Sequence, residues 1–147
     1  LALMGRQLIG TALDRLEEGQ LDPVDQPDIG VTYCPKLTKS DGQLDFSRTA
    51  NELERQVRAL HPWPGTFTFL GGERLKIYPP VNSLLDEQAH GESGEVVRVN
   101  GGSIVVGTSE GALEIFKVQR AGRPVVDVKS FLAGNALSVG SKLGDAP

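Results

Sequence analysis

The sequence predicts a mainly β protein: a small OB-like Greek-key barrel with one or two helices, preceded by an isolated amphipathic helix. From Thr66 onward, apolar and polar residues alternate in short segments, which is the period of half-buried strands. The turns at Gly71-Gly72 and Asn100-Gly101-Gly102 separate such segments and are typical of hairpins. The chain has 18 glycines and 9 prolines in 147 residues, and five short strands at close spacing favour a barrel.

The first predicted element is an amphipathic helix over Leu1–Glu18, which Gly19 ends in a left-handed conformation. Its apolar residues recur at steps of three and four: Leu1, Met4, Leu8, Ala12 and Leu16. Residues 21–31 contain two prolines, three aspartates and no periodicity, so we expect a linker there. No second long helix follows, and we expect a missing domain to cover the apolar stripe. The alternative is that the stripe packs on the barrel.

A second helix is predicted over Ser47–Leu60. Thr49 and Glu52 have the spacing of a capping box at its start. Pro62 and Pro64 prevent its continuation, because proline has no amide hydrogen and disfavours helix in the preceding residue. Its apolar face consists of Ala50, Leu53, Val57 and Leu60.

The strands follow in order. TFTFL and ERLKIY form a hairpin with Phe67 and Phe69 on one side, and EVVRVN and SIVVGT form the next hairpin. After a turn comes ALEIFKVQR, in which Leu113, Ile115 and Lys117 are predicted to share a face. Asp127 is predicted to cap a short helix, VKSFLAG, and the tail VGSKLG is predicted to add a closing strand.

Charge is unevenly distributed along the chain. The net charge is −4, and residues 1–30 account for all of it, with six acidic and two basic side chains. Residues 31–147 therefore hold 13 acids and 13 bases, and residues 112–142 hold five bases against two acids, a local excess of +3. Phosphate binding relies on lysine and arginine, so this distribution is compatible with a modest basic face.

Composition also excludes several classes of protein. The single cysteine, Cys34, cannot form an internal disulfide, and a cytoplasmic location is expected. No apolar run approaches the roughly 20 residues that span a bilayer, and no signal peptide is recognised, so no membrane partner is expected.

The standard catalytic motifs are missing from the sequence. It has no dinucleotide-binding fingerprint, no P-loop and no Cys/His metal spacing, so we predict no catalytic residue and no metal ligand here. His61 lies between a helix end and two prolines, where a turn or packing role is expected. His90 lies in a polar loop and is expected to be solvated.

The candidate binding residues are basic. Lys36 and Lys39 lie on an extended segment after the linker, where two ammonium groups can reach a phosphate backbone. Arg55 and Arg58 are three residues apart and point to the same side of the second helix. Trp63, held between two prolines, either packs the helix onto the barrel, which we favour, or stacks on a base.

The segment from Thr32 to Phe67 closely resembles the start of the C-terminal domain of methionyl-tRNA formyltransferases. Further similarity lies in ERLKIY and in AGRPVVDVKSFLAG, so the resemblance covers nearly the whole chain. Cys34, Phe46 and His61 depart from the family, which more often has Ala, Trp and Asn there. The matching residues are Thr32-Tyr33-Cys34-Pro35-Lys36-Leu37, Lys39, Leu44-Asp45-Phe46, Leu53-Glu54-Arg55, Val57-Arg58-Ala59-Leu60-His61 and Pro62-Trp63-Pro64-Gly65.

The resemblance implies that catalysis and the barrel belong to different domains of the enzyme. Enzymes of this family transfer a formyl group from 10-formyltetrahydrofolate to the methionine of initiator tRNA, using Asn, His and Asp in an N-terminal Rossmann-like domain. By this comparison, residues 1–20 are the terminal helix of that missing catalytic domain, residues 21–31 the linker and residues 32–147 the barrel. The 147-residue chain is expected to be catalytically inactive alone and to bind no cofactor. The full-length enzyme is expected to be monomeric.

The resemblance also implies that the linker end and the barrel hold the tRNA. The expected tRNA-binding residues are Lys36, Lys39, Arg55, Arg58, Lys117, Arg120 and Arg123. Two alternatives remain: the barrel of a related sugar or folate formyltransferase, and a free-standing interaction barrel. The sequences PKLTK and LERQVRALHPWPG favour the tRNA enzyme. The uncovered apolar stripe of the first predicted helix disfavours the free-standing barrel.

Overall fold

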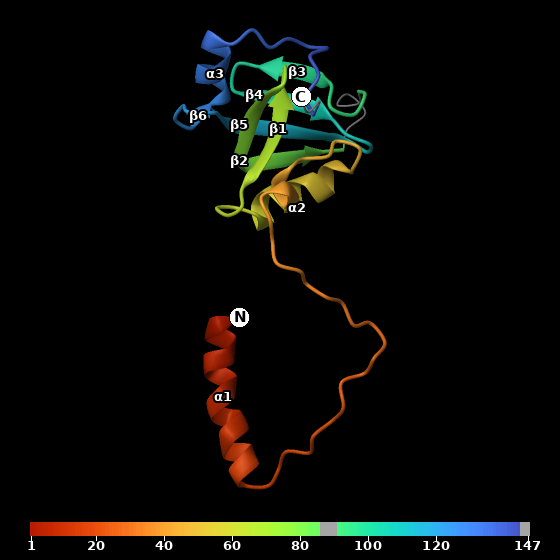
Figure 1. The fold of residues 1–147 in the computed structure, drawn as a ribbon, viewed down its shortest axis with the longest axis vertical. Helices are drawn as coiled ribbons and strands as arrows, with labels where there is room; N and C mark the ends of the chain where they lie inside the picture. Colours follow the sequence, from red (N-terminus) through yellow and green to blue (C-terminus); the bar gives the residue numbers. More distant parts are fainter. Residues whose placement is uncertain (86–90, 145–147) are drawn as a thin grey trace. The chain divides into compact units, whose positions relative to one another are not determined.

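The computed structural model describes residues 1–85 and 91–144, so the predicted solvated position of His90 lies outside the described residues. The chain divides into two compact units, Leu1–Pro35 and Lys36–Pro147 (Figure 1). Each unit is described by itself. Among the described residues, no helix is long and apolar enough to cross a membrane.

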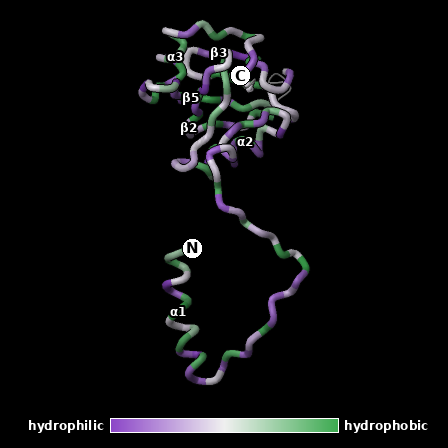
Figure 2. Tube along the Cα trace, in the orientation of Figure 1, coloured by the Kyte–Doolittle hydropathy of each residue, from purple (hydrophilic) through white to green (hydrophobic). Residues whose placement is uncertain are grey.

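The first unit contains one regular element, α1 (Ala2–Glu17). Hydrophobic and polar residues interleave along it (Figure 2). Glu18 is the C-cap of the helix, and Gly19 follows it with a φ of +68°, the left-handed stop that the sequence predicts. The amide of Gly19 donates to the carbonyl of Leu16 (3.1 Å) and that of Gln20 to Arg15 (2.8 Å), which is the Schellman pattern. Within this unit no second helix or strand covers the apolar stripe.

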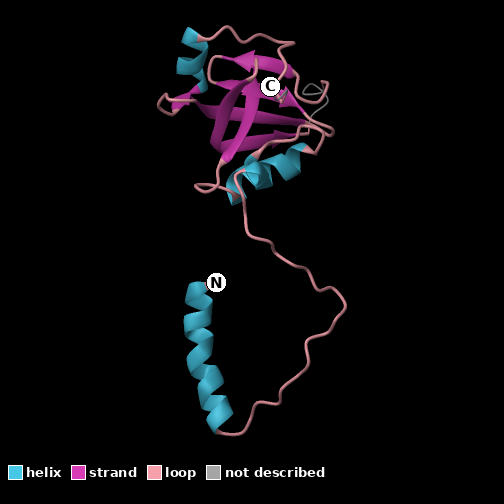
Figure 3. Ribbon diagram, in the orientation of Figure 1, coloured by secondary structure: helices cyan, strands magenta, loops and turns pink. Residues whose placement is uncertain are grey.

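The second unit is built on one antiparallel sheet, shown as magenta arrows in Figure 3. Its strands run in the spatial order β1-β2-β5-β4-β3, and β6 pairs with β5. These elements confirm the predicted mainly β fold and both predicted hairpins. The strands are β1 (Thr66–Leu70), β2 (Glu73–Leu84), β3 (Val96–Asn100), β4 (Ser103–Gly107), β5 (Ala112–Arg120) and β6 (Val126–Asp127).

The tail joins the two outer strands of this sheet. The amide of Leu143 donates to the carbonyl of Gly94, just before β3, at 2.8 Å. The amide of Gly144 donates to the carbonyl of Phe69 on β1 at 3.0 Å. The tail therefore closes the sheet through isolated bridges, and the closing strand predicted over VGSKLG does not form. Closure matters because it leaves the barrel without a fully open sheet edge.

Strand β2 is longer than the predicted ERLKIY segment. It continues to Leu84 through Pro79 and Pro80, which occupy a register shift between Tyr78 and Val81 in the pairing with β5. Proline has no amide hydrogen to donate to the ladder, and a bulge is where a strand tolerates it. On β5, the buried residues opposite this shift are Ile115 and Val118, which are three positions apart instead of the two expected of a regular strand. Lys117 is therefore exposed, and its predicted place on the face of Ile115 was wrong.

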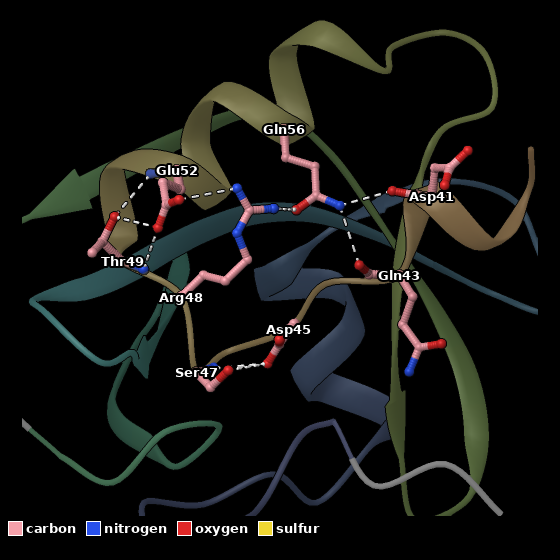
Figure 4. Close-up of polar contacts among 8 residues, drawn as sticks. All are labelled: Asp41, Gln43, Asp45, Ser47, Arg48, Thr49, Glu52 and Gln56. Atoms are coloured by element: carbon pink, nitrogen blue, oxygen red, sulfur yellow. Dashed lines mark hydrogen bonds and ion pairs between the residues drawn. The ribbon is translucent and has the colours of Figure 1, made fainter. Parts of the chain in front are cut away.

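Helix α2 (Ala50–Ala59) starts later than the predicted helix but carries the predicted capping box. The hydroxyl of Thr49 accepts from the amide of Glu52 at 3.3 Å, and the Glu52 carboxylate accepts from the amide of Thr49 at 3.0 Å (Figure 4). After α2, the His61–Pro62 and Trp63–Pro64 peptide bonds are cis. Helix α3 (Val128–Gly134) begins after Asp127, whose side chain accepts from the amide of Ser130 at 2.7 Å, as predicted.

The core of the second unit lies inside the curved sheet. Helix α2 contributes Leu53 and Val57, and α3 contributes Val128 and Phe131. In Figure 1, α2 and α3 lie on different sides of the strands. The strands add Leu75, Ile77, Val96, Ile104, Val106, Leu113, Ile115 and Val118 to the same cluster. Burial of these apolar side chains fixes the direction in which the polar faces of α2, β2 and β5 point.

Candidate nucleic-acid interface

The loop that precedes α2 is fastened to that helix by side-chain hydrogen bonds. Gln56 donates from Nε2 to the carbonyl oxygens of Asp41 (2.8 Å) and Gln43 (3.1 Å), as Figure 4 shows. Arg48 donates to Glu52 Oε1 at 3.2 Å and to Gln56 Oε1 at 3.4 Å. These bonds link the 3-10 turn η1 (Ser40–Gly42) to the exposed side of α2.

A tight turn fixes the backbone around the two candidate lysines. The amide and hydroxyl of Thr38 donate to Asp41 Oδ2 at 2.6 and 2.9 Å. These two hydrogen bonds, the amide first, hold the pKa of Asp41 below its ordinary value, so this carboxylate stays ionised and keeps the turn closed. Lys36 and Lys39 are exposed beside the turn, and neither forms an ion pair within the described part of the chain. Both ammonium groups are available to an anionic ligand.

The two candidate arginines on α2 differ in their surroundings. Both are exposed. Arg58 Nε lies 3.1 Å from Glu54 Oε1, one turn earlier on the helix. Arg55 forms no ion pair with any described residue. Since Glu54 offsets the charge of Arg58, Arg55 is the stronger candidate for a phosphate contact.

The outer face of β2 and β5 carries a basic cluster that the sequence reasoning only partly identified. Arg74, Lys76 and Tyr78 alternate with the buried Leu75 and Ile77 along β2. We call Arg74, Lys76 and Lys117 the β2–β5 basic face. In the register of the sheet, Lys76 lies opposite Gln119 and Tyr78 lies opposite Lys117. The sequence reasoning named Lys117 but missed Arg74 and Lys76, although the alternation within ERLKIY places them on the polar face.

Aromatic rings lie under one edge of this face. The guanidinium carbon of Arg74 lies 3.4 Å from the centroid of the Phe67 ring, a cation–π contact. Phe67 and Phe69 meet edge to face with centroids 5.7 Å apart, which confirms that they share a side. Packing on Phe67 restricts the Arg74 side chain while the residue as a whole remains exposed.

Arg120 and Arg123 lie where β5 ends. Arg120 forms an ion pair with Glu73 and donates to Asn135 Oδ1 at 2.6 Å. A cavity of about 650 Å³ lies between the end of β5 and α3. It is lined by residues that include Glu73, Arg120, Arg123, Ser130 and Asn135. Arg120 also borders a cavity of about 120 Å³ that Arg74 and Lys76 line, so it adjoins the β2–β5 basic face. Glu73 offsets the charge of Arg120, whereas Arg123 forms no ion pair with a described residue.

Trp63 is more exposed than the favoured packing role predicts. Its side chain retains 58% of its accessible surface, so the expectation that it packs onto the barrel was wrong. His61 is also exposed, and its ring meets that of Tyr78 edge to face at 6.1 Å. A cleft of about 40 Å³ beside them is lined by residues that include Pro62, Pro64, Lys76 and Tyr78. The turn that carries Trp63 thus adjoins the β2–β5 basic face through Lys76.

Several described carboxylates take part in turns, helix caps and ion pairs. No group of three or more His, Cys, Asp or Glu side chains among them could hold a metal ion. The described carboxylates with a lowered pKa are each held by a nearby hydrogen-bond donor in a turn, a helix cap or an ion pair. These residues are Asp41, Asp45, Glu52, Glu92 and Asp127. Such groups stay ionised near neutral pH and serve the fold instead of proton transfer.

The fold and this surface define a small, closed antiparallel barrel domain with a basic outer face on β2 and β5. Its sequence matches the family described as "Formyl transferase, C-terminal domain" over residues 36–136. The chain belongs to the formyl transferase C-terminal domain family.

Curated relatives extend the match over the whole chain. A methionyl-tRNA formyltransferase of Streptococcus pneumoniae (strain Hungary19A-6) is 37% identical over 147 residues, which is 99% of this chain and 46% of that protein. The corresponding protein of S. pneumoniae serotype 4 (strain TIGR4) has the same identity and coverage. The chain thus spans about half the length of these relatives.

Solved structures support the fold. HypX from Aquifex aeolicus, in complex with tetrahydrofolic acid, is similar with a TM-score of 0.54 and 21% identity, covering 87% of this chain and 22% of that one. A substituted form of the same protein gives a TM-score of 0.55 and 20% identity, covering 88% of this chain and 23% of that one.

Proposed function

We propose that this chain is the tRNA-binding, C-terminal part of a methionyl-tRNA formyltransferase, the enzyme that formylates methionyl initiator tRNA with 10-formyltetrahydrofolate as donor. The observation that carries the proposal is a set of exposed cations without ion-pair partners among the described residues, on a barrel of the formyl transferase family. The 37% identity over 99% of the chain to enzymes of that name supports it.

The proposal includes a division of labour between parts of the enzyme. Residues 1–20 are the terminal helix of a Rossmann-like catalytic domain, residues 21–31 the linker and residues 32–147 the barrel that holds the tRNA. We assign the folate donor and the formyl transfer to the catalytic domain, because the carboxylates with a lowered pKa in the described part of the chain serve turns, helix caps and ion pairs. The full-length enzyme is a cytoplasmic monomer in this proposal.

Two kinds of phosphate contact are proposed. Lys36 and Lys39, next to the linker, act as point charges, and Arg55 adds a planar guanidinium on α2. The β2–β5 basic face extends the surface along the barrel, with Arg58, Arg120 and Arg123 at its margins. Such contacts are independent of base sequence, and each displaces counterions from the RNA. The barrel therefore supplies affinity and orientation and leaves recognition of the methionyl end to the catalytic domain.

The test is the affinity of the 147-residue chain for initiator methionyl-tRNA at several salt concentrations. We predict weak binding that falls steeply as salt is added. The double change Lys36→Ala and Lys39→Ala should weaken binding about tenfold at low salt and reduce the salt slope by roughly one to two. Filter binding or fluorescence anisotropy gives both values.

A charge-matched control separates contact from net charge. Lys129 on α3 and Arg6 on α1 are exposed and, like Lys36 and Lys39, form no ion pair with a described residue, so their double replacement by alanine removes two comparable charges. This control should retain most of the affinity. Binding that ignores salt, or equal losses in the two double variants, would contradict the proposed contacts. Absence of any tRNA binding would favour the barrel of a related sugar or folate formyltransferase.

A further inference from the structure

The turn between α2 and β1 presents the sole tryptophan of the sequence to solvent. Trp63 lies between Pro62 and Pro64, whose rings restrict the backbone on both sides. The amide of Gly65 donates to the carbonyl of Leu60 at 2.9 Å, which closes the turn onto the end of α2. The indole is therefore carried on a restrained backbone, so little backbone entropy would be lost if a ligand covered it.

The surroundings of this turn are aromatic and basic. Thr66 pairs with Ile77, and this register places the turn beside Tyr78. The Tyr78 hydroxyl donates to Gln119 Oε1 at 2.7 Å, which fixes its ring, and the His61 ring rests against it. Lys76 lines the small cleft next to the turn, and Lys117 lies opposite Tyr78 on β5.

These neighbours indicate the chemistry of the ligand. The cleft of about 40 Å³ beside this turn has room for little more than a water molecule, so a planar group cannot enter it, and the exposed indole of Trp63 is the surface on which such a group can lie. Lys76 in the lining of this cleft and Lys117 opposite Tyr78 favour an anionic ligand. A flat ring joined to an anion describes a nucleotide, and base–aromatic stacking requires that the base be unpaired.

We propose that Trp63 and Lys76, supported by His61 and Tyr78, form a subsite for an unpaired nucleotide of the bound RNA. The base stacks on the indole and the adjacent phosphate contacts the ammonium group of Lys76. This inference rests on the proposed function and deepens it, because it assigns a single-stranded segment of the RNA to one corner of the barrel. The remaining cations bind phosphates of paired and unpaired RNA alike.

Intrinsic fluorescence tests the subsite directly, because Trp63 is the only tryptophan. The 147-residue chain is titrated at low salt with a ten-nucleotide single-stranded RNA and with a ten-base-pair duplex RNA. Anisotropy of a dye on the RNA reports binding in the same samples. Stacking on the indole should quench its emission, so the single strand should quench Trp63 strongly and the duplex weakly, although both bind.

Three variants and one control variant complete the test. Trp63→Ala should bind the single strand about tenfold more weakly and the duplex unchanged, and Trp63→Phe should recover most of the loss. Lys76→Ala should reduce quenching at a given RNA concentration more than Lys129→Ala, which removes the same charge from α3. Since Trp63 is exposed, circular dichroism should confirm that its variants fold.

The outcomes separate this inference from the proposed function. Binding of both RNAs without quenching, or with unchanged affinity in Trp63→Ala, would overturn the subsite and leave the phosphate contacts standing. Binding of neither RNA would overturn both. Quenching that appears only when an N-terminal catalytic domain is added, with no RNA present, would show that Trp63 is an interdomain contact and would also overturn the subsite.

Discussion

Gly42 lies where the loop that carries Lys39 meets the turn that carries Trp63. A Cβ built on Gly42 would overlap the carbonyl oxygen of Gly65, and Gly42 itself is buried. The neighbouring atom belongs to the backbone and cannot rotate away. A single residue without a side chain therefore allows two parts of the proposed RNA surface to pack closely.

Replacing Gly42 with alanine should lower the free energy of unfolding by about 1–3 kcal/mol, because one of the two backbone segments must move. Urea unfolding followed by circular dichroism measures this change. Gly101, in the β3–β4 turn, is the control: its Cβ would meet no atom within 4 Å, so Gly101→Ala should be nearly neutral. Equal stability of the two variants would argue against close packing at Gly42.

At the scale of elements, α2 links the loop that precedes it to the barrel. The capping box of α2 stabilises the first turn of the helix. The amide and hydroxyl of Thr49 and the side chain of Arg48 all donate to the Glu52 carboxylate. These donors, the Thr49 amide first, hold the pKa of Glu52 below its ordinary value of 4.5. The folded state therefore favours the ionised carboxylate.

Thr49→Ala should destabilise the domain by about 1 kcal/mol, and Thr49→Ser should retain most of the wild-type stability. The pH dependence has a fixed sign. Because the pKa of Glu52 is lowered on folding, its contribution is complete above pH 4.5 and is lost as the pH falls through the lower folded value. Urea unfolding at pH 7 and at pH 3 should show a smaller difference between wild type and Thr49→Ala at the acidic pH. A larger difference there would contradict the capping role.

The elements that could be predicted from the sequence carry their signals locally. The Thr49 and Asp127 caps, the Gly19 stop and the Asn100-Gly101-Gly102 turn all act within a few residues. The continuation of β2 past Pro79 depends on pairing with β5, whose partner residues lie 28 to 34 positions further along the chain, and no local signal reports it. Alternation was sufficient to place Arg74 and Lys76 on the polar face, but a basic residue in a strand gives no sign of function by itself.

The exposure of Trp63 shows a different limit of sequence reasoning. An aromatic residue between two prolines fits either a packing or a stacking role, and only the path of the turn decides between them. In the structure the amide of Gly65 closes the turn by donating to the carbonyl of Leu60, and β1 follows directly. Trp63 remains largely exposed on this turn. The tertiary position of the turn, and not its composition, makes Trp63 available to a ligand.

At the scale of the whole molecule, the charges form local patches. The net charge of −4 comes from residues 1–30, and residues 31–147 contain equal numbers of acidic and basic residues. Attraction of RNA to the barrel therefore depends on where the cations lie and not on an overall positive field. Closure of the barrel by Leu143 and Gly144 holds β1 and β3 in place, so the outer face of β2 and β5 is a fixed surface.

Mapping the RNA contact by NMR tests the central claim most directly. The ¹⁵N-labelled 147-residue chain is titrated with initiator tRNA at low salt, and amide shift changes are followed residue by residue. We predict that the perturbed amides cluster around Lys36–Lys39, the last turn of α2 and the adjoining parts of β2 and β5, and that these changes reverse when salt is added. No perturbation of these residues, or a cluster confined to the β3–β4 turn around Asn100, would contradict the account.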